Sequence, residues 1–157
     1  RSWVRGDTRR RLSHTHPMNA LPPAILVRSL GDARLVLEAA AGQAVTLLSL
    51  PDAAATLGAA YWQSLVQAAR ADHPAAPAHD LLDCGTAGGY ALAALRQGLT
   101  GIVFTGDAEQ RDKLRAIAEE QGALLLDSRP QAFDPANRRN PEADCRVWLA
   151  AMAARER

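Results

Sequence analysis

The chain has 157 residues, 48% of them hydrophobic, which is enough to build the core of one domain without disulfides or metals. The formal net charge is +1, but it is unevenly spread, because residues 1–17 alone carry five Arg and one Asp. The rest of the chain is therefore mildly acidic, which argues against a general nucleic-acid surface. No apolar run reaches the roughly 18 to 20 residues that a membrane-spanning helix needs.

Residues 1–19 are predicted to be a disordered basic leader or an expression remnant, because they show no hydrophobic periodicity and do not begin with Met. Residues 20–157 are predicted to form a single α/β domain. The two cysteines, Cys84 and Cys145, have no spacing typical of a metal site or a redox motif. We therefore expect a reducing, cytoplasmic location. The strong preference for Arg over Lys and the abundance of Ala favour a bacterial source with a GC-rich genome.

Short apolar runs alternate with helical patterns along the whole chain. The apolar runs predict buried strands at 24–30, 45–50, 79–83, 102–104 and 123–126. Capping residues and glycines then predict helices from Ser29 or Asp32 to Gly42, Asp52 to about Ala71, Gly88 to Gly98, Asp107 to Gly122, and Asn140 onward. The polar segments 72–78 and 127–140 are expected to be loops.

This alternation predicts an α/β fold with a three-layer open, mainly parallel five-stranded sheet, helices on both faces and an added C-terminal helix. Five strands are too few to close an eight-stranded barrel. We expect the flavodoxin-like strand order 2-1-3-4-5, with a Rossmann-like order, 3-2-1-4-5, as the alternative. In either order, ligands are expected to bind beyond the carboxyl ends of the strands.

The glycine-rich turn after the strand at 79–83 is the best candidate for a ligand site. Glycine allows close approach to the backbone, and the first N–H groups of the following helix attract anions. The predicted ligand-binding residues are Gly85, Thr86, Gly88, Gly89 and Thr105. The turn has no Walker lysine, which argues against a standard nucleoside triphosphate site. A structural role in a tight strand-to-helix turn explains the same glycines and is favoured over anion binding.

The run from Leu81 to Gly85, with Asp107 after the next strand, is similar to the first motif of Rossmann-like methyltransferases. In that family an apolar strand leads to an acidic residue and a glycine-rich loop, and a second acidic residue ends the next strand. The glycines are spaced differently here, and Gly106 separates the second acid from its strand. We interpret the resemblance as the layout that strand–helix–strand units share.

Carboxylates follow several of the predicted strands, and the catalytic candidates among them are Asp83, Asp107 and Asp127. Asp52 and Asp107 stand where helices need N-caps, so capping is the favoured role for both. Asp83 lies in an apolar run, where an unpaired carboxylate is costly, so it must find a partner or face a ligand. Cys84 is expected to be a buried structural thiol. No metal site is predicted.

Two functions remain open, and the sequence does not decide whether the chain is an enzyme. The favoured one is a small non-enzymatic module that binds a ligand or another copy of itself, through apolar helix faces around Trp62 and Trp148. The alternative is a small enzyme acting on a phosphorylated or nucleotide-like substrate at the Gly85–Gly89 turn, with Asp83 as its acid or base. The expected partners are a small anionic ligand and a second copy, without nucleic acid or membrane, and any cofactor is unknown.

Overall fold

The computed structural model describes residues 21–157, so the predicted leader at 1–19 lies outside the described residues. One parallel sheet contains six strands: β1 (Ala24–Val27), β2 (Val45–Ser49), β3 (Ala78–Asp83), β4 (Gly101–Val103), β5 (Leu124–Leu126) and β6 (Ala132–Phe133). Six helices accompany them: α1 (Leu30–Ala40), α2 (Ala53–Thr56), α3 (Ala59–Asp72), α4 (Gly88–Arg96), α5 (Ala108–Gln121) and α6 (Pro141–Arg155).

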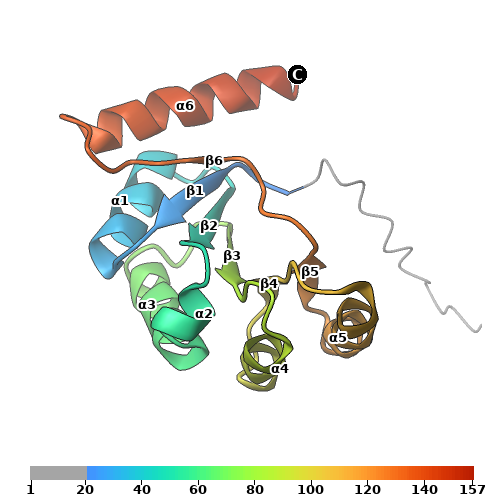
Figure 1. Ribbon diagram of the computed structural model, residues 1–157. Helices are drawn as coiled ribbons and strands as arrows, with labels where there is room; N and C mark the ends of the chain where they lie inside the picture. The colour runs from blue at the N-terminus through green and yellow to red at the C-terminus, as the bar shows by residue number, and fades with distance from the viewer. Residues whose placement is uncertain (1–20) are drawn as a thin grey trace, which may run out of the picture.

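The predicted class, an open α/β fold with a parallel sheet and helices around it, is confirmed (Figure 1). The sheet has a sixth strand because Ala132 and Phe133 pair with β1. Two residues within a polar segment are too few for hydrophobic periodicity to reveal a strand. The strand order is 5-4-3-2-1-6, which differs from both predicted orders, since β1 to β5 each pair with their neighbours in sequence.

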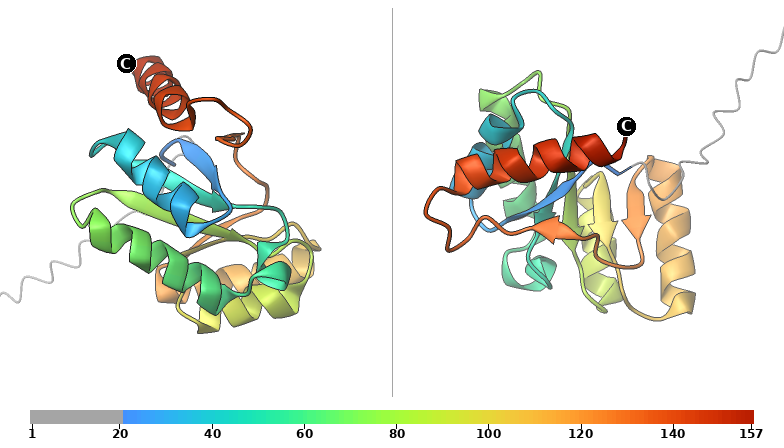
Figure 2. Two further views of the ribbon diagram at one scale, coloured as in Figure 1. Left: turned by 90° about the vertical axis from the view of Figure 1, so that its left-hand side faces the viewer. Right: turned by 90° about the horizontal axis from the view of Figure 1, so that it is seen from above.

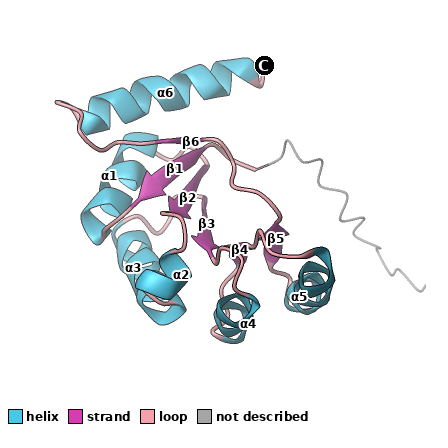
Figure 3. Ribbon diagram, viewed as in Figure 1, coloured by secondary structure: helices cyan, strands magenta, loops and turns pink. Residues whose placement is uncertain are grey.

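The sequential strand order determines where the crossover helices lie. Right-handed connections between successive neighbours place α1, α3, α4 and α5 along the same side of the sheet, as Figures 1 and 3 show. Alternate strand residues such as Ile25, Leu47 and Leu82 pack with these helices in the main hydrophobic core. The strand residues between them, including Leu48, Leu81 and Val103, point to the opposite face and form a second, smaller cluster.

Helix α6 lies over the end of the sheet that carries β6, outside the row of crossover helices (Figure 2). Cys145 and Leu149 are 0% and 1% exposed in the main core, and α6 contacts α1. The Phe133 ring of β6 lies 5.5 Å from the Trp148 ring, centroid to centroid. No helix in the described part of the chain is both long enough and apolar enough to cross a membrane.

Three predicted N-caps are confirmed, because Ser29, Asp107 and Asn140 each accept a backbone N–H from the first turn of their helix. Asp52 differs from the prediction, since its side chain makes no capping bond and its backbone is left-handed, with φ 58°. The single helix predicted from Asp52 to Ala71 is also corrected. Gly58 separates α2 from α3. Its φ of 86° is a conformation that residues with a side chain rarely adopt.

Trp62 lies in the main core and is 0% exposed. The prediction that it lies on an outer helix face available for self-association is therefore wrong. Helix α3 packs against α1, α4 and β3, and these contacts cover more than one side of the helix. Helical periodicity alone does not distinguish such burial from an outer interface, because both need an apolar side.

Replacing Trp62 with Ala is expected to lower the free energy of unfolding by about 3–5 kcal/mol, because the change leaves a large cavity. Trp62→Phe is expected to lower it clearly less, since the buried indole Nε1 has no hydrogen-bond partner within residues 21–157. Urea unfolding followed by circular dichroism measures both values. Equal losses for the two variants would contradict this account of the core.

Candidate functional site

Asp83 lies at the centre of the carboxyl end of the sheet, the region that the sequence predicts as the site. It is 3% exposed. Its Oδ1 accepts the backbone N–H of Gly85 at 2.8 Å and the backbone N–H of Asp52 at 3.1 Å. Its Oδ2 accepts Nη1 of Arg129 at 2.6 Å. Each carboxylate oxygen therefore has a donor within the chain.

Arg129 and Ser49 connect this carboxylate to other parts of the fold. Arg129 belongs to the β5–β6 connection, and its Nη2 donates to the backbone oxygen of Ser49 at 3.0 Å. Ser49 ends β2, and its Oγ accepts the N–H of Asp83 at 2.8 Å. Ser49, Asp52, Asp83, Gly85 and Arg129 are referred to below as the Asp83 cluster. The cluster ties the ends of β2 and β3 to the β5–β6 connection.

The Asp83 cluster explains how a carboxylate is accommodated in an apolar strand. The guanidinium of Arg129 and two backbone N–H groups replace the water that the carboxylate loses on burial. A general acid or base must instead place an oxygen within hydrogen-bond reach of its substrate. The contacts of Asp83 thus favour a structural role, and its predicted role in catalysis stays a prediction.

Gly85 is required by the local geometry of the cluster. Its φ is 58°, and a Cβ at this position would overlap the Asp52 carboxylate. Its carbonyl oxygen accepts the N–H of Thr105 at 2.8 Å. Gly106 also approaches the turn, since a Cβ there would lie 2.9 Å from the carbonyl oxygen of Thr86. The turns that follow β3 and β4 therefore pack directly on each other.

The remaining predicted ligand-binding residues surround the N-terminus of α4. Thr86, Gly89 and Thr105 are exposed, and Gly88 is half-buried. Ala87, at the N-cap position, has no side chain that can accept an N–H from the first turn. Gly89 has no positive φ, and within residues 21–157 no atom apart from its chain neighbours and the backbone of its own helix lies within 4 Å of a Cβ built on it. Packing and conformation thus explain Gly85 but not Gly89.

The three predicted catalytic carboxylates have separate structural surroundings. Asp107 caps α5 by accepting the N–H of Gln110 at 2.9 Å. Asp127 is exposed, with Oδ2 4.0 Å from Nη1 of Arg111, and Asp83 is held by the Asp83 cluster. Within residues 21–157, no three His, Cys, Asp or Glu side chains gather closely enough to hold a metal ion.

Cys84 lies beside the Asp83 cluster and is 3% exposed. Burial, together with the neighbouring charge of Asp83, raises the pKa of its thiol to about 12. The thiol is therefore protonated at neutral pH and is a poor nucleophile there. These surroundings fit the structural thiol expected from the sequence.

Sequence reasoning missed an ion pair between Arg28, just after β1, and Asp134, just after β6. Both Asp134 carboxylate oxygens accept from the guanidinium, at 2.8 and 2.9 Å. The hydrogen bond from Arg28 and a second one from the Ala136 N–H lower the pKa of Asp134. Arg129 and Asp134 both fall in a polar segment without periodicity, so the sequence offers no signal for their distant partners.

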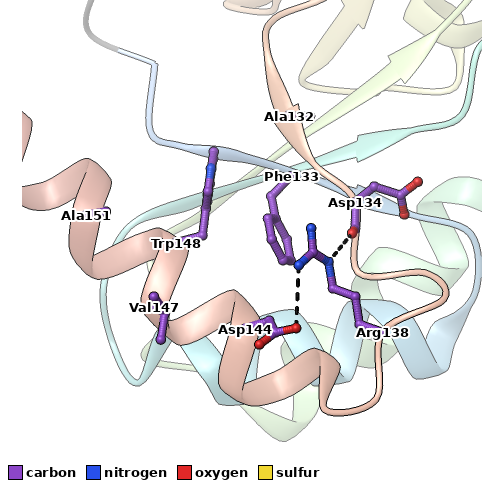
Figure 4. Close-up of a pocket in the computed structure, with 8 residues that line it drawn as sticks. All are labelled: Ala132, Phe133, Asp134, Arg138, Asp144, Val147, Trp148 and Ala151. Atoms are coloured by element: carbon purple, nitrogen blue, oxygen red, sulfur yellow. Dashed lines mark hydrogen bonds and ion pairs between the residues drawn. The ribbon is translucent and has the colours of Figure 1, made fainter.

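A groove of about 490 Å³ lies between β6 and the outer side of α6 (Figure 4). This α6 groove is lined by Ala132, Phe133, Asp134, Arg138, Asp144, Val147, Trp148 and Ala151. The guanidinium of Arg138 lies 4.3 Å from the centre of the Phe133 ring, and its Nη1 is 3.4 Å from Oδ2 of Asp144. Val147 is 70% exposed. The groove thus combines apolar walls with three charged side chains, Asp134, Arg138 and Asp144.

Asp83→Ala is expected to lower the free energy of unfolding by about 3–5 kcal/mol, because it leaves Arg129 and two backbone N–H groups without their acceptor. Arg129→Met is expected to be destabilising too, since it removes the charged partner of a buried carboxylate. In the double variant the two losses are expected to be strongly non-additive, because both remove the same contact. Urea unfolding of the four proteins measures this coupling, and simple additivity would contradict it.

Comparison with known proteins adds no family to this description, since no protein-family model matches the chain and a search of curated proteins gives no match.

Proposed function

We propose that the protein is a small non-enzymatic binding module that associates with a second copy of itself through α6. The observation that carries this proposal is an exposed apolar stripe on the outer side of that helix. Val147 is 70% exposed, and the exposed residues Ala150, Ala151 and Ala154 follow it at i+3, i+4 and i+7. These positions share one side of a helix. They are referred to below as the α6 stripe.

The α6 stripe is additional to the side of the helix that α6 uses within its own chain. Cys145 and Leu149 already fill that inner side, and Gln43 Nε2 donates to the Leu149 carbonyl oxygen. A surface helix normally presents charged and polar residues on the side opposite its core contacts. A helix with two apolar sides is instead typical of one that is covered twice.

The position of Val147 on α6 favours an antiparallel pair around a twofold axis, the commonest symmetry of homodimers. The acidic residues of the first turn do not determine this orientation, because Glu142 is paired with Arg146 and Asp144 with Arg138. Val147 lies near the middle of the helix, so the two valines would meet close to the axis. The α6 groove adjoins the stripe through Val147 and Ala151, and the second copy would cover it.

The contacts of the Asp83 cluster support the non-enzymatic part of this proposal. Asp83 is bonded to Arg129 and to backbone N–H groups, and Asp107 caps a helix, so both carboxylates have structural roles. We also propose that the protein is bacterial, lies in the cytoplasm and binds no nucleic acid. These three properties stay predictions. Free, buried thiols at Cys84 and Cys145 are typical of a reducing compartment.

Val147→Glu is expected to convert a dimer into a monomer, because it would place two carboxylates together at the twofold axis. Light scattering with size-exclusion chromatography over a concentration series measures the mass against the 16.8 kDa of one chain. Tyr61→Glu is the matched control, since Tyr61 is 56% exposed on α3 and lies outside the stripe. A wild-type monomer at high concentration, or equal effects of the two substitutions, would refute self-association through α6.

The alternative function is a small enzyme acting on a phosphorylated or nucleotide-like substrate at the Gly85–Gly89 turn. The observation that favours it is Gly89, a glycine in the first turn of α4 that neither backbone conformation nor packing requires. Without a side chain there, the first N–H groups of α4 stay open to an anion. Thr86 and Thr105 are exposed, and the N–H of Thr105 donates to the carbonyl oxygen of Gly85 in the same turn.

If the turn binds phosphate, inorganic phosphate and adenosine monophosphate should each raise the melting temperature of the protein. Gly89→Glu should then raise the melting temperature without ligand, because a carboxylate suits a helix N-terminus, and should abolish the response to both anions. Differential scanning fluorimetry measures both effects. The absence of any response in the wild type would remove the basis of this alternative.

A further inference from the structure

The sheet does not close into a barrel, and a second pocket lies between its two edges. β5 forms one edge of the sheet and β6 the other, and the connection between them runs along the open side (Figure 1). A pocket of about 450 Å³ lies there, between β5, the start of β1 and α6. It is referred to below as the seam pocket. Its volume falls in the range of about 300–1,000 Å³ typical of small-molecule sites.

The walls of the seam pocket are mainly apolar and come from distant parts of the chain. Leu125 and Leu126 line it from β5, Pro22 and Pro23 from the entry to β1, and Trp148 and Met152 from α6. Trp148 and Met152 are only half-buried, so the fold leaves part of these side chains open at the pocket. Such walls favour the apolar body of a ligand.

One basic side chain breaks the apolar lining of the seam pocket. In the described part of the chain, seven arginines form ion pairs with Asp or Glu: Arg28, Arg34, Arg70, Arg111, Arg129, Arg138 and Arg146. Arg115, on α5, is half-buried and lines the pocket, but it has no such partner within residues 21–157. Its guanidinium therefore presents unpaired donors beside an apolar surface, the arrangement that suits a planar carboxylate.

Asp127 also lines the seam pocket, but Nη1 of Arg111 lies 4.0 Å from its Oδ2 and offsets its charge. Ser128 and Gln131 add neutral polar groups at the same end. Among residues 21–157, the charge in the pocket that has no ion-pair partner is thus the positive charge of Arg115.

We propose that the seam pocket binds a small organic carboxylate with an apolar body. The carboxylate pairs with Arg115, and the apolar body lies against Trp148, Met152 and Leu125. This site is separate from the α6 stripe, because Val147 and Ala151 do not line it. The inference therefore does not depend on self-association, and each can fail without the other.

The test uses the full chain and three probes with eight carbon atoms each: octanoate, octylamine and octanol. The protein contains two methionines, Met18 and Met152, so carbon-13 methyl labelling gives two NMR signals, and Met152→Leu assigns them. Octanoate is expected to shift the Met152 signal saturably and to bind at least about tenfold more tightly than octylamine or octanol.

Arg115→Met is expected to weaken octanoate binding about tenfold while leaving the weak binding of octanol unchanged, because it removes the charge and keeps an apolar side chain. Arg96→Met is the matched control, an exposed arginine on α4 outside the seam pocket, and should leave both affinities unchanged. Val147→Glu should leave octanoate binding intact. Equal affinity for the three probes, an unmoved Met152 signal, or octanoate binding insensitive to Arg115→Met would each overturn the proposal.

Discussion

The buried carboxylate of Asp83 is the constraint on which the carboxyl end of the sheet depends. An unpaired charge at this position would cost several kcal/mol, so the surrounding backbone must supply donors. Asp52 donates its N–H to Asp83 and adopts a left-handed backbone conformation. For residues other than glycine, this conformation costs about 1–2 kcal/mol. Gly85 must then lack a side chain, because the Asp52 carboxylate lies over it. One carboxylate therefore accounts for both unusual backbone conformations beside it.

The same carboxylate fixes the course of the chain after β5. The strand order requires the connection from β5 to β6 to return from one edge of the sheet to the other. Arg129 holds this connection to Asp83 and to the Ser49 carbonyl, near the middle of the sheet. The connection is thus anchored over the face of the sheet opposite the crossover helices. The seam pocket lies between this connection, the start of β1 and α6.

The features that could be predicted from the sequence are those that depend on neighbouring residues. Ser29, Asp107 and Asn140 cap their helices through N–H groups three positions away, and short apolar runs identify β1 to β5. Arg129 is 46 positions from Asp83, and β6 contains two residues, so local periodicity carries no information about either. Strand order depends on the same kind of distant pairing. For this reason the region of the candidate site was predictable, whereas the partner of its central residue was not.

Helix α6 brings the two proposed surfaces together, because it is apolar on three sides. Cys145 and Leu149 face α1, Trp148 and Met152 reach the seam pocket, and the α6 stripe remains exposed. A helix that served only to cover α1 would need no more than the first of these sides. Trp148 lines both the seam pocket and the α6 groove, and its ring packs beside Phe133. The two surfaces nevertheless use different side chains, because Val147 and Ala151 do not line the seam pocket, so a ligand held there leaves the α6 stripe free for a second copy.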